Sequence, residues 1–474
     1  MMTEGTSIPL CVDLDGTLVK IDTLHQALFL LLRRDFSSLF RLPGWILRGR
    51  AHLKDQVLQR VTLDAHALPY HDTFLEWLRS EKAAGRKLVL ATASNYRTAH
   101  AVADHLGIFD EVLASNAETN LRRNQKLLEI RERFDRFAYA GNEAADIPIW
   151  EAAEEIILVN PSAAARKAFE ARAARVFEAR RPLLRTFTRA MRCHQWIKNV
   201  LIFAPMFLAH RFSDPLCIRD ALFAFFAFSF AASSIYVLND LFDLSADQHH
   251  PRKRRRPFAS GDLPISVGML MTPVLMIISI LFCLFLPRSF LLVLIAYYAI
   301  TTLYSWRIKQ IAIADVLTLA VLYSLRIVAG SVATGTTASG WFIEFAIFLF
   351  LSLALVKRLS ELREMKETAG IGPSQRERGY TTADLPMLLA FGAASGYISV
   401  FVFTMYLGSD RVALLYSRPE ILWLFCPLLL YWITRLWLLA WRGGMKDDPL
   451  AFAARDLQTY LVAATGIAAI LFAI

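Results

Sequence analysis

The sequence predicts two domains of different fold class: an α/β doubly wound domain with a helical cap, followed by an all-α bundle that crosses a membrane several times. Charged residues recur every few positions up to about residue 185, whereas long apolar stretches dominate from Trp196 to Ile474. Hydrophobic residues make up 55% of the chain and the mean hydropathy is +0.39, more apolar than an ordinary soluble domain. In the first part, apolar strand patterns alternate with helical patterns, which favours a parallel sheet.

These patterns also predict the domain boundaries. We expect the α/β domain over residues 1–160, a linking helix over 161–185 and the membrane domain over 186–474. The Ala- and Arg-rich linker would lie near the lipid surface or be a solvated connector. A helical insert at about 22–71 would form the cap and screen a site from water. Its Leu, Phe and Trp side chains would form an apolar core or touch the membrane.

The basic balance of the chain, a formal net charge of +10, bears on its partners. In a membrane protein, basic loops fix orientation and face anionic lipid. The composition therefore points to a membrane surface and argues against nucleic acid as a partner.

Polar residues gather where two apolar strands of the first domain are predicted to end. Asp13 and Asp15 follow the strand "IPLCV", and Thr92 and Ser94 lie at the end of "KLVLATAS". Carboxylates at the end of a buried strand are costly unless they take part in chemistry or bind a metal. Catalytic groups at the carboxyl ends of strands are typical of a doubly wound sheet.

The run "DLDGT", which begins at Asp13, resembles the first motif of the haloacid dehalogenase superfamily of phosphatases. The resemblance implies that Asp13 is the nucleophile, which forms an aspartyl phosphate, and that Asp15 is the general acid and base. It also implies that Thr92 binds phosphate, with Ser94 close by, and that Lys126 is the lysine of the third motif.

The fourth motif departs from the pattern of that family. "GNEAAD" has Asp146 in the later acidic position but Asn142 in place of the first acid. The resemblance implies Mg²⁺ held by Asp13, Asp146 and Asn142, although an amide oxygen brings no charge. Two alternatives follow: an active phosphatase domain, or a catalytically silent regulatory or docking module.

Nine apolar segments of the second half are candidate membrane-spanning helices. They lie at about residues 194–211, 215–239, 265–286, 288–305, 311–333, 341–356, 386–407, 419–440 and 458–474. Most Lys and Arg residues of this half fall in loops on one side, and the other side has Arg211, Arg219, Arg288, Arg411 and Arg418. This bias predicts a multi-pass protein of the bacterial inner membrane with the N-terminal domain and the polar motifs in the cytoplasm. Within the spans, Arg326 and Glu344 are expected to form a structural ion pair.

Acidic residues gather at the cytoplasmic end of the second predicted span. In a helix running through Asp240, Asp243 and Asp247, the three carboxylates share one face, with Asn239 at its edge. Such carboxylates repel one another unless a cation lies among them, and oxygen ligands favour Mg²⁺ with substrate phosphates. A solvated helix end beside a basic loop is the alternative.

The pattern NDxxDxxxD, from Asn239 to Asp247, resembles the first aspartate-rich motif of the UbiA-type membrane prenyltransferases, and the resemblance extends from about residue 185 to the C-terminus. In that family the motif binds Mg²⁺ and a substrate diphosphate. The usual second motif, DxxxD, is altered here, because Lys357, Arg358 and Glu361 stand where acids are expected.

This alteration is similar to the decaprenyl-phosphate phosphoribosyltransferase branch, as are "WIKN", which contains Lys198, "HPRKRRRPFASG" and "DDPLAFAARD". That branch joins a polyprenyl phosphate to phosphoribosyl diphosphate and releases pyrophosphate. Such substrates add anionic groups, which favour basic side chains. Substrate contacts are therefore assigned to these residues: Lys198, Lys253, Arg256, Lys357, Arg358 and Glu361. Alternatively, Lys357 and Glu361 form a surface ion pair, and the basic run mainly sets topology.

Together these features predict a bifunctional, Mg²⁺-dependent membrane enzyme. The membrane domain would transfer a phosphoribosyl or related group from a diphosphate donor to polyprenyl phosphate. The N-terminal domain would then hydrolyse the phosphate of the lipid-linked sugar. The alternative is transfer of a prenyl group from a prenyl diphosphate to a small acceptor, which the usual second acidic motif would favour.

Overall fold

A parallel β-sheet is the centre of the N-terminal part of the chain in the computed structural model, which describes residues 8–178, 182–368, 379–445 and 449–474. The six strands lie in the order β3-β2-β1-β4-β5-β6, and every pair is parallel. Their bounds are β1 (Leu10–Val12), β2 (Leu88–Asn95), β3 (Glu111–Ser115), β4 (Ala138–Gly141), β5 (Glu155–Val159) and β6 (Arg175–Phe177). All three residues of β1 are fully buried, as expected for a central strand covered on both faces.

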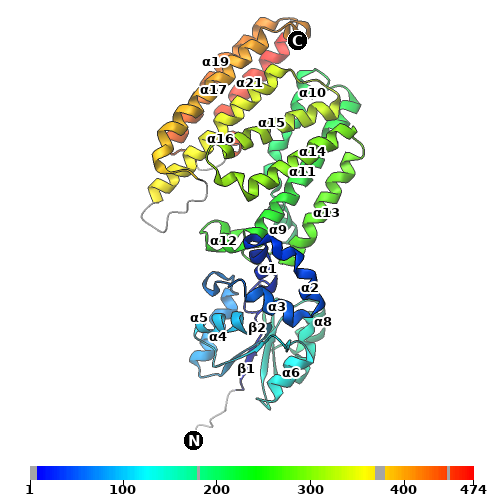
Figure 1. Cartoon of the computed structure of the whole chain (residues 1–474), viewed down its shortest axis with the longest axis vertical. Helices are drawn as coiled ribbons and strands as arrows, with labels where there is room; N and C mark the ends of the chain where they lie inside the picture. The colour runs from blue at the N-terminus through cyan, green and yellow to red at the C-terminus, as the bar shows by residue number, and fades with distance from the viewer. Residues whose placement is uncertain (1–7, 179–181, 369–378, 446–448) are drawn as a thin grey trace. The chain divides into compact units, whose positions relative to one another are not determined.

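Helices cover both faces of this sheet, which confirms the predicted α/β class. Figure 1 shows α4 and α5 on one side and α6 and α8 on the other. The bounds of these helices are α4 (Asp72–Ala83), α5 (Tyr96–Leu106), α6 (Asn124–Arg131), α7 (Ile147–Ala152) and α8 (Ala163–Phe169). The apolar faces of α6, α7 and α8 pack on the strands through Ile130, Ile149, Trp150, Ala165 and Phe169.

The predicted linking helix over residues 161–185 is wrong in part, because this stretch supplies an edge strand. Helix α8 ends at Phe169, and β6 then pairs with β5. The ring of Phe177 lies 5.2 Å from Phe74 and 5.3 Å from Trp77, centroid to centroid. This aromatic burial favours a strand in a segment whose alanines favour helix. A helix, α9 (Leu183–Ala190), forms only after it.

The predicted cap insert is helical. It contains α1 (Thr23–Arg34), α2 (Leu42–Leu47) and α3 (Arg50–Leu58), with short 3-10 turns η1 (Phe36–Phe40) and η2 (Ala65–Ala67). The cap has its own apolar core, which includes Leu31, Trp45 and Val57. Five large apolar side chains between residues 36 and 47 are exposed and are considered below.

The chain divides into two units whose boundaries differ from the predicted domains. The first unit is Met1–Arg192 with Tyr236–Pro273, and the second is Cys193–Ile235 with Val274–Ile474. The acidic and basic segment after residue 235 thus belongs to the same unit as the sheet and the cap. That segment includes α12 (Leu244–His249) and η6 (Lys253–Arg255).

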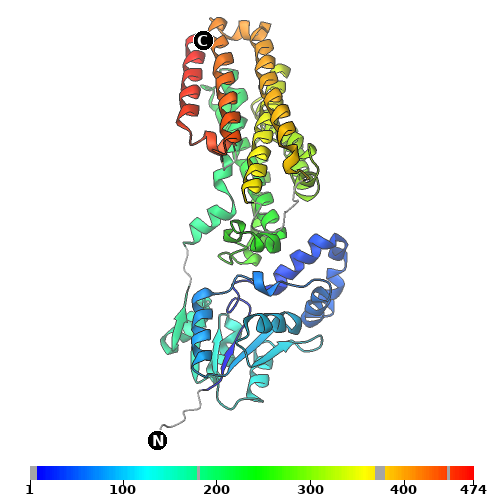
Figure 2. The same ribbon diagram turned by 90° about the vertical axis from the view of Figure 1, so that its left-hand side faces the viewer.

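The second unit is helical, and its long helices run roughly side by side (Figure 2). Their bounds are α11 (Pro215–Phe242), α13 (Ile265–Cys283), α14 (Arg288–Trp306), α15 (Ala314–Thr334), α16 (Gly340–Thr368), α17 (Leu385–Leu407), α19 (Phe425–Trp441) and α21 (Leu457–Ala473). The last residues of α11, from Tyr236, and the first residues of α13, up to Pro273, belong to the first unit. Short pieces are η5 (Cys193–Phe203), α10 (Ala204–Leu208), η7 (Ile308–Gln310), η8 (Thr382–Asp384), α18 (Asp410–Leu415), η9 (Pro419–Leu424) and α20 (Pro449–Ala453).

The predicted count of nine membrane spans is not confirmed. In the described part of the chain, 6 helices are long and apolar enough to cross a membrane: Pro215–Phe242, Ile265–Cys283, Arg288–Trp306, Ala314–Thr334, Thr382–Leu407 and Pro419–Trp441. The expected span at 341–356 lies in α16, and Leu457–Ala473 is a shorter apolar helix. The expected span at 194–211 is not one helix, since η5 is followed by the short α10.

A buried polar network explains why η5 packs where it does. Asn199 donates to the Ser229 hydroxyl at 2.9 Å and accepts from Arg326 Nε at 2.8 Å. Arg326 also contacts Tyr297 and the Leu322 carbonyl. The predicted Arg326–Glu344 pair is therefore wrong. The guanidinium of Arg326 is satisfied by neutral hydrogen-bond partners, so no carboxylate has to be buried beside it.

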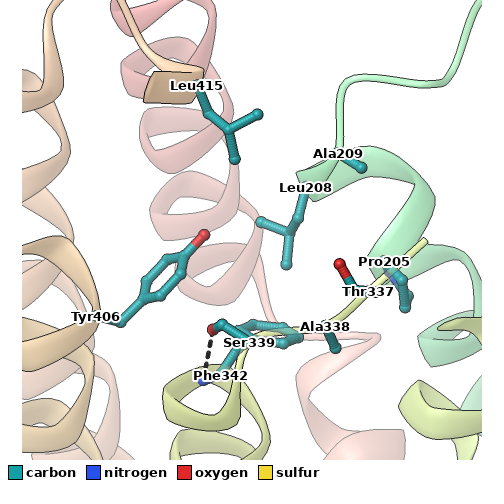
Figure 3. A pocket seen from close by; sticks show the side chains of 9 residues that line it. All are labelled: Pro205, Leu208, Ala209, Thr337, Ala338, Ser339, Phe342, Tyr406 and Leu415. Atoms are coloured by element: carbon teal, nitrogen blue, oxygen red, sulfur yellow. Dashed lines mark hydrogen bonds between the residues drawn. The ribbon is translucent and has the colours of Figure 1, made fainter. Parts of the chain in front are cut away.

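A small cavity of about 60 Å³ lies within the second unit (Figure 3). Tyr406, Thr337 and Ser339 contribute polar side chains, and Leu208 and Leu415 contribute apolar ones. This volume suits a few water molecules. None of the residues that line it is among the predicted site residues.

Gly330 of α15 allows the close approach of η5, and this generates the first prediction. A Cβ there would lie 2.0 Å from the Ile202 carbonyl oxygen, a backbone atom that cannot rotate away. Gly330→Ala should therefore cost about 1–3 kcal/mol and lower the melting temperature of the purified protein. Gly340→Ala is the matched control, since a Cβ there meets nothing within 4 Å. Equal melting temperatures for both variants would contradict the packing described.

Candidate active sites

The carboxyl ends of β1 and β4 bring four side chains of the first unit together. Asp13 follows β1, and its Oδ1 accepts from Lys126 Nζ at 2.8 Å. Lys126 also donates to the Tyr139 hydroxyl at 2.9 Å and lies 3.6 Å from Asp146 Oδ1. Asp13, Lys126 and Asp146 are all buried, so the ammonium group compensates two desolvated carboxylates. Oδ2 of Asp13 accepts no hydrogen bond from any described residue, which leaves it available for attack on a phosphorus atom.

The second carboxylate of the "DLDGT" run is held by the neighbouring strand and by the cap. Oδ2 of Asp15 accepts from the Ser94 hydroxyl, and Oδ1 accepts from the backbone N–H of Thr23 at 2.9 Å. Thr23 is the first residue of cap helix α1, and its hydroxyl lies 3.1 Å from that of Ser94. Thr92 is buried on β2, where its hydroxyl accepts from Ser94 N–H at 3.0 Å. Asp15, Thr92 and Ser94 therefore meet at one edge of the sheet, as predicted.

Burial sets the titration of both carboxylates. Desolvation raises the pKa of Asp13 to about 7, and Lys126 acts in the opposite direction. Desolvation also raises the pKa of Asp15 to about 6, with Asp22 adding to the effect and the Ser94 hydrogen bond opposing it. A carboxyl whose pKa lies this far above its usual range exchanges protons closer to neutral pH, as a general acid and base must. A cation beside Asp13 would favour the ionised form that a nucleophile needs.

The altered fourth motif places Asn142 over the tight turn after Asp15. The amide oxygen of Asn142 accepts from the Thr17 hydroxyl at 3.3 Å, and a Cβ at Gly16 would lie 2.1 Å from Asn142 Nδ2. Asp146 accepts from the Tyr139 hydroxyl at 2.8 Å and from the N–H groups of Asn142 and Glu143. Both oxygens of Asp146 thus have protein donors, and its assignment as a metal ligand stays a prediction.

A lysine of the cap also reaches this edge of the sheet. Lys54 on α3 donates to the Ala93 carbonyl at 2.5 Å and to Asn120 Oδ1 at 3.1 Å. Burial lowers the pKa of Lys54, while Asp15 and Asp22 oppose that shift. The cap therefore contributes a cation beside the loop that carries Thr92 and Ser94.

The acidic segment is not one continuous helix, which corrects the predicted geometry. Helix α11 ends at Phe242, and Asp243 caps the separate helix α12. The backbone carbonyl of Asn239 accepts a hydrogen bond from the N–H of Asp243 at 2.9 Å, which holds the turn between the two helices. Asp240 and Asp247 are buried, and Asp243 is half-buried. Despite the break, Asp240 and Asp247 stay close, because both contact the same nitrogen, Arg256 Nη1.

Each of these three carboxylates contacts an arginine from a different segment. Asp240 Oδ1 accepts from Arg192 and from Arg256 Nη1, the latter at 3.2 Å. Asp247 accepts from Arg256 at 2.6 Å, and Asp243 lies 2.8 Å from Arg33 Nη1. Desolvation raises the pKa of Asp247 to about 6 against the effect of Arg256.

The position of Arg192 depends on an unusual backbone conformation. Its φ is 52°, in the left-handed region that non-glycine residues rarely adopt. This conformation ends α9 and places the guanidinium over the Tyr236 ring, 5.1 Å from its centroid. Backbone strain of this kind gathers at functional sites.

These side chains suit a magnesium site only in part. Carboxylate oxygens are ligands that Mg²⁺ prefers, and Oδ2 of Asp240 accepts no hydrogen bond from the described residues. Nevertheless, no group of three or more His, Cys, Asp or Glu among the described residues is placed to hold a metal ion. The assignment of Asn239, Asp240, Asp243 and Asp247 as Mg²⁺ ligands therefore stays a prediction. Lys253, half-buried on η6, lies in the basic run beside Arg256.

The cap contacts the acidic segment directly, within the first unit. Gln26 of α1 and Gln248 of α12 are both buried and exchange amide hydrogen bonds of 2.6 and 3.2 Å. The rings of Phe29 and Phe242 meet edge to face at 5.4 Å. Sequence patterns could not reveal this contact, because its residues lie more than 200 positions apart.

The altered second motif forms a buried ionic cluster in the second unit. Arg358 is 2% exposed, and its guanidinium contacts Asp315 at 2.6 Å and Glu361 at 2.5 Å. It also donates to the Tyr304 hydroxyl at 3.1 Å, and Tyr380 donates to Asp315 at 3.0 Å. Arg358 therefore positions Asp315 and Glu361, rather than presenting its guanidinium to solvent.

Two other predicted substrate residues lie on the second unit. Lys357 is half-buried on α16, beside Arg358. Lys198, half-buried on η5, places its ammonium 5.6 Å from the centroid of the Tyr323 ring. Their assignment to substrate binding stays a prediction.

The sequence did not lead us to predict several residues of these clusters. Asp315 had a signal, since an acid inside a predicted span calls for a partner. Arg192, Arg33 and Lys54 had none, because isolated basic residues outside motifs are common. Tyr139 lies in an apolar strand pattern, where its hydroxyl has no distinguishing spacing.

Two family models match the chain. Residues 200–463 match the model of the UbiA prenyltransferase family, and residues 10–151 match that of haloacid dehalogenase-like hydrolases. The chain is 36% identical over 469 residues to the uncharacterized protein y4nM of Sinorhizobium fredii, covering 96% of this chain and 89% of that protein.

Two shorter relatives match the C-terminal part. The nodulation protein NoeC of Azorhizobium caulinodans is 32% identical over 286 residues, covering 60% of this chain and 91% of that protein. The decaprenyl-phosphate phosphoribosyltransferase of Mycobacterium tuberculosis is 31% identical over 211 residues, covering 44% of this chain and 70% of that protein.

The buried pair of Arg358 and Asp315 generates the second prediction. Arg358→Ala leaves a buried carboxylate without its cation, which should cost about 3–5 kcal/mol of stability and lower the melting temperature sharply. Arg358→Met combined with Asp315→Leu removes both charges and should recover most of that loss. Arg219→Ala, which removes an exposed pair with Asp220, is the control and should change little. A double variant as unstable as Arg358→Ala would contradict this view.

Proposed function

The chain belongs to the UbiA prenyltransferase family and carries a haloacid dehalogenase-like domain at its N-terminal end, and from this we propose a bifunctional membrane enzyme. The part of the chain that matches the UbiA family transfers a phosphoribosyl or related group from a diphosphate donor to polyprenyl phosphate. Its hydrolase-like domain then removes the phosphate from the lipid-linked sugar. Multiple apolar helices support an integral, multi-pass membrane protein. We place it in the bacterial inner membrane with both sites on the cytoplasmic side, as the positive-inside bias suggests.

The observation that carries the transfer half is the set of arginines around the acidic segment. Arg192, Arg256 and Arg33 are already oriented toward Asp240, Asp247 and Asp243. Guanidinium groups bind phosphates with two parallel hydrogen bonds, so an incoming diphosphate is a natural second partner for them. Mg²⁺ held by Asp240 and Asp243 would neutralise charge on the leaving diphosphate.

The chemistry requires little covalent participation from the protein. An oxygen of the lipid phosphate attacks the anomeric carbon of the donor, and the bond from that carbon to the diphosphate breaks. Pyrophosphate leaves with the bonding electrons. Arg192 and Arg256 act by holding the donor so that its anomeric carbon faces the lipid phosphate.

The altered second motif supports a phosphoribosyl rather than a prenyl donor. In a prenyltransferase with the usual second motif, DxxxD, the two aspartates would be free to bind a metal cation. Here Arg358 neutralises Asp315 and Glu361, which makes this cluster less acidic. The similarity to a decaprenyl-phosphate phosphoribosyltransferase favours the same donor class. Transfer of a prenyl group to a small acceptor is the alternative that the assay below distinguishes.

The hydrolase half rests on the geometry around Asp13. Its Oδ2 attacks the phosphorus atom of the sugar phosphate, Lys126 balances charge, and Asp15 protonates the leaving oxygen. Water then hydrolyses the aspartyl phosphate, with Asp15 accepting a proton. The intact set of Asp13, Asp15, Thr92 and Lys126 favours an active domain over a silent docking module, although Asn142 brings one charge less to a bound Mg²⁺.

Transfer activity gives the third prediction. Purified protein with polyprenyl phosphate and ribose-labelled phosphoribosyl diphosphate should yield lipid-extractable label. Asp240→Asn should lower the rate at least about a hundredfold, because the group that faces the leaving diphosphate is lost. Asp220→Asn, at the other end of α11, is the control. Absence of lipid label together with prenylation of an aromatic acceptor would overturn the proposal.

Phosphatase activity gives the fourth prediction. The full-length protein should hydrolyse p-nitrophenyl phosphate, and chelation of divalent cations should abolish the activity. Asp13→Asn should reduce it at least about a thousandfold, since the nucleophile is removed, whereas Asp104→Asn, exposed on α5, should not. Activity that survives Asp13→Asn would contradict the nucleophile assignment. Absence of activity in the unmodified protein would favour the silent module.

A further inference from the structure

Five large apolar side chains are exposed in one short part of the cap. We call residues 36–50 the cap tip; it comprises η1, α2 and the start of α3. Phe40 is 81% exposed and Leu47 is 87% exposed. The other three are Phe36, Leu39 and Ile46, which are 53%, 40% and 59% exposed. Single exposed apolar residues are common, but five within a stretch of twelve residues are typical of an interaction site.

The cap tip is ordered, so this exposure is built into the fold. Asp35 caps η1 through the backbone N–H of Ser37 at 3.0 Å and the hydroxyl of Ser38 at 2.9 Å. Trp45 points inward into the cap core, and the Arg60 guanidinium lies 4.7 Å from the centroid of its ring. Trp45 and Leu42 of α2 pack on the cap core, and Ser38 of η1 is buried, whereas Phe36, Leu39, Phe40, Ile46 and Leu47 are exposed on the outside of these short helices.

The charges of the cap tip fit an anionic surface. Arg41, Arg48 and Arg50 are exposed among the apolar side chains. Between Asp35 and Asp55 the sequence contains no acidic residue. Apolar side chains flanked by arginines are the composition that lies in the interface of a membrane with anionic lipid.

Within the first unit, the cap also contacts the end of a candidate membrane span. Phe242 is the last residue of α11, a candidate membrane span. Phe29 of cap helix α1 packs against Phe242, and Arg33 donates to the Phe242 carbonyl at 3.3 Å. Helix α1 therefore lies beside the last residue of this candidate span. The cap tip begins directly after α1, at Phe36.

From these contacts we propose that the cap tip inserts into the lipid interface, with Phe40 and Leu47 among the acyl chains and Arg41 and Arg48 at the headgroups. This interaction does not depend on the proposed chemistry. It would hold the hydrolase site at the membrane surface, where a phosphate on a lipid-linked substrate is presented. It also accounts for the open apolar surface of an otherwise well-packed cap.

The test places an environment-sensitive fluorophore, NBD, at residue 47 of the full-length protein. Leu47→Cys is made in a background in which Cys193 and Cys426 are serine, since the other three cysteines are buried. Leu128→Cys is the matched control, an exposed leucine on α6 of the same unit. Both are reconstituted in nanodiscs that contain phosphatidylglycerol and a spin-labelled lipid.

We expect blue-shifted emission at residue 47 with several-fold quenching by the spin-labelled lipid, and neither effect at residue 128. Water-like emission at residue 47 would overturn the proposal. Blue-shifted emission without lipid quenching would also overturn it, because a second copy or another protein surface would then cover the tip.

A second measurement tests the role of charge. Replacing phosphatidylglycerol by phosphatidylcholine, or introducing Arg41→Glu with Arg48→Glu, should weaken quenching at residue 47. Each basic residue near an anionic surface strengthens attachment by about fivefold. Quenching that is indifferent to both changes would show that the arginines do not select an anionic surface and would overturn that part of the proposal.

Discussion

The cost of burying carboxylates is the constraint on which both candidate sites depend. A desolvated carboxylate is tolerated only with a cation or several hydrogen-bond donors beside it. Asp13 has Lys126, Asp240 has Arg192 and Arg256, and Asp315 has Arg358. Except for Arg256, which follows Asp240 by 16 positions, each cation lies at least 43 positions from its acid, so the ion pair also fixes how distant segments pack.

Under the proposed function, this arrangement prepares the Asp13 and Asp240 clusters for an anionic substrate. The cations that neutralise Asp13 and Asp240 in the protein alone are the groups best suited to hold a phosphate once it arrives. Under the proposed function, substrate binding would be an exchange of partners: the guanidinium groups would turn to phosphate oxygens, and the carboxylates would become available to a metal ion. Arg358 differs from the others because it is almost fully buried, so we regard it as a positioning residue.

Much of the architecture could be predicted from local patterns. Strand and helix alternation predicted the parallel sheet, and the motif spacing placed Asp13, Asp15, Thr92 and Ser94 at one edge of it. The apolar segments predicted α11, α13, α14, α15 and α17 closely. The sequence did not reveal β6, because an edge strand there depends on the rings of Phe74 and Trp77. Neither could it reveal that Asp243 breaks the helix, nor that Arg33 and Gln26 of the cap reach the acidic segment, since these are long-range contacts.

The central claim is that one chain carries out two successive reactions on the same lipid, and mass spectrometry of the lipid product tests it most directly. The unmodified protein, supplied with polyprenyl phosphate and phosphoribosyl diphosphate, should yield a lipid-linked ribose without the 5-phosphate. Full-length Asp13→Asn should accumulate the same lipid with that phosphate retained. Identical lipid products from the two proteins would contradict the account, because the N-terminal domain would then have no part in processing the product of the transfer.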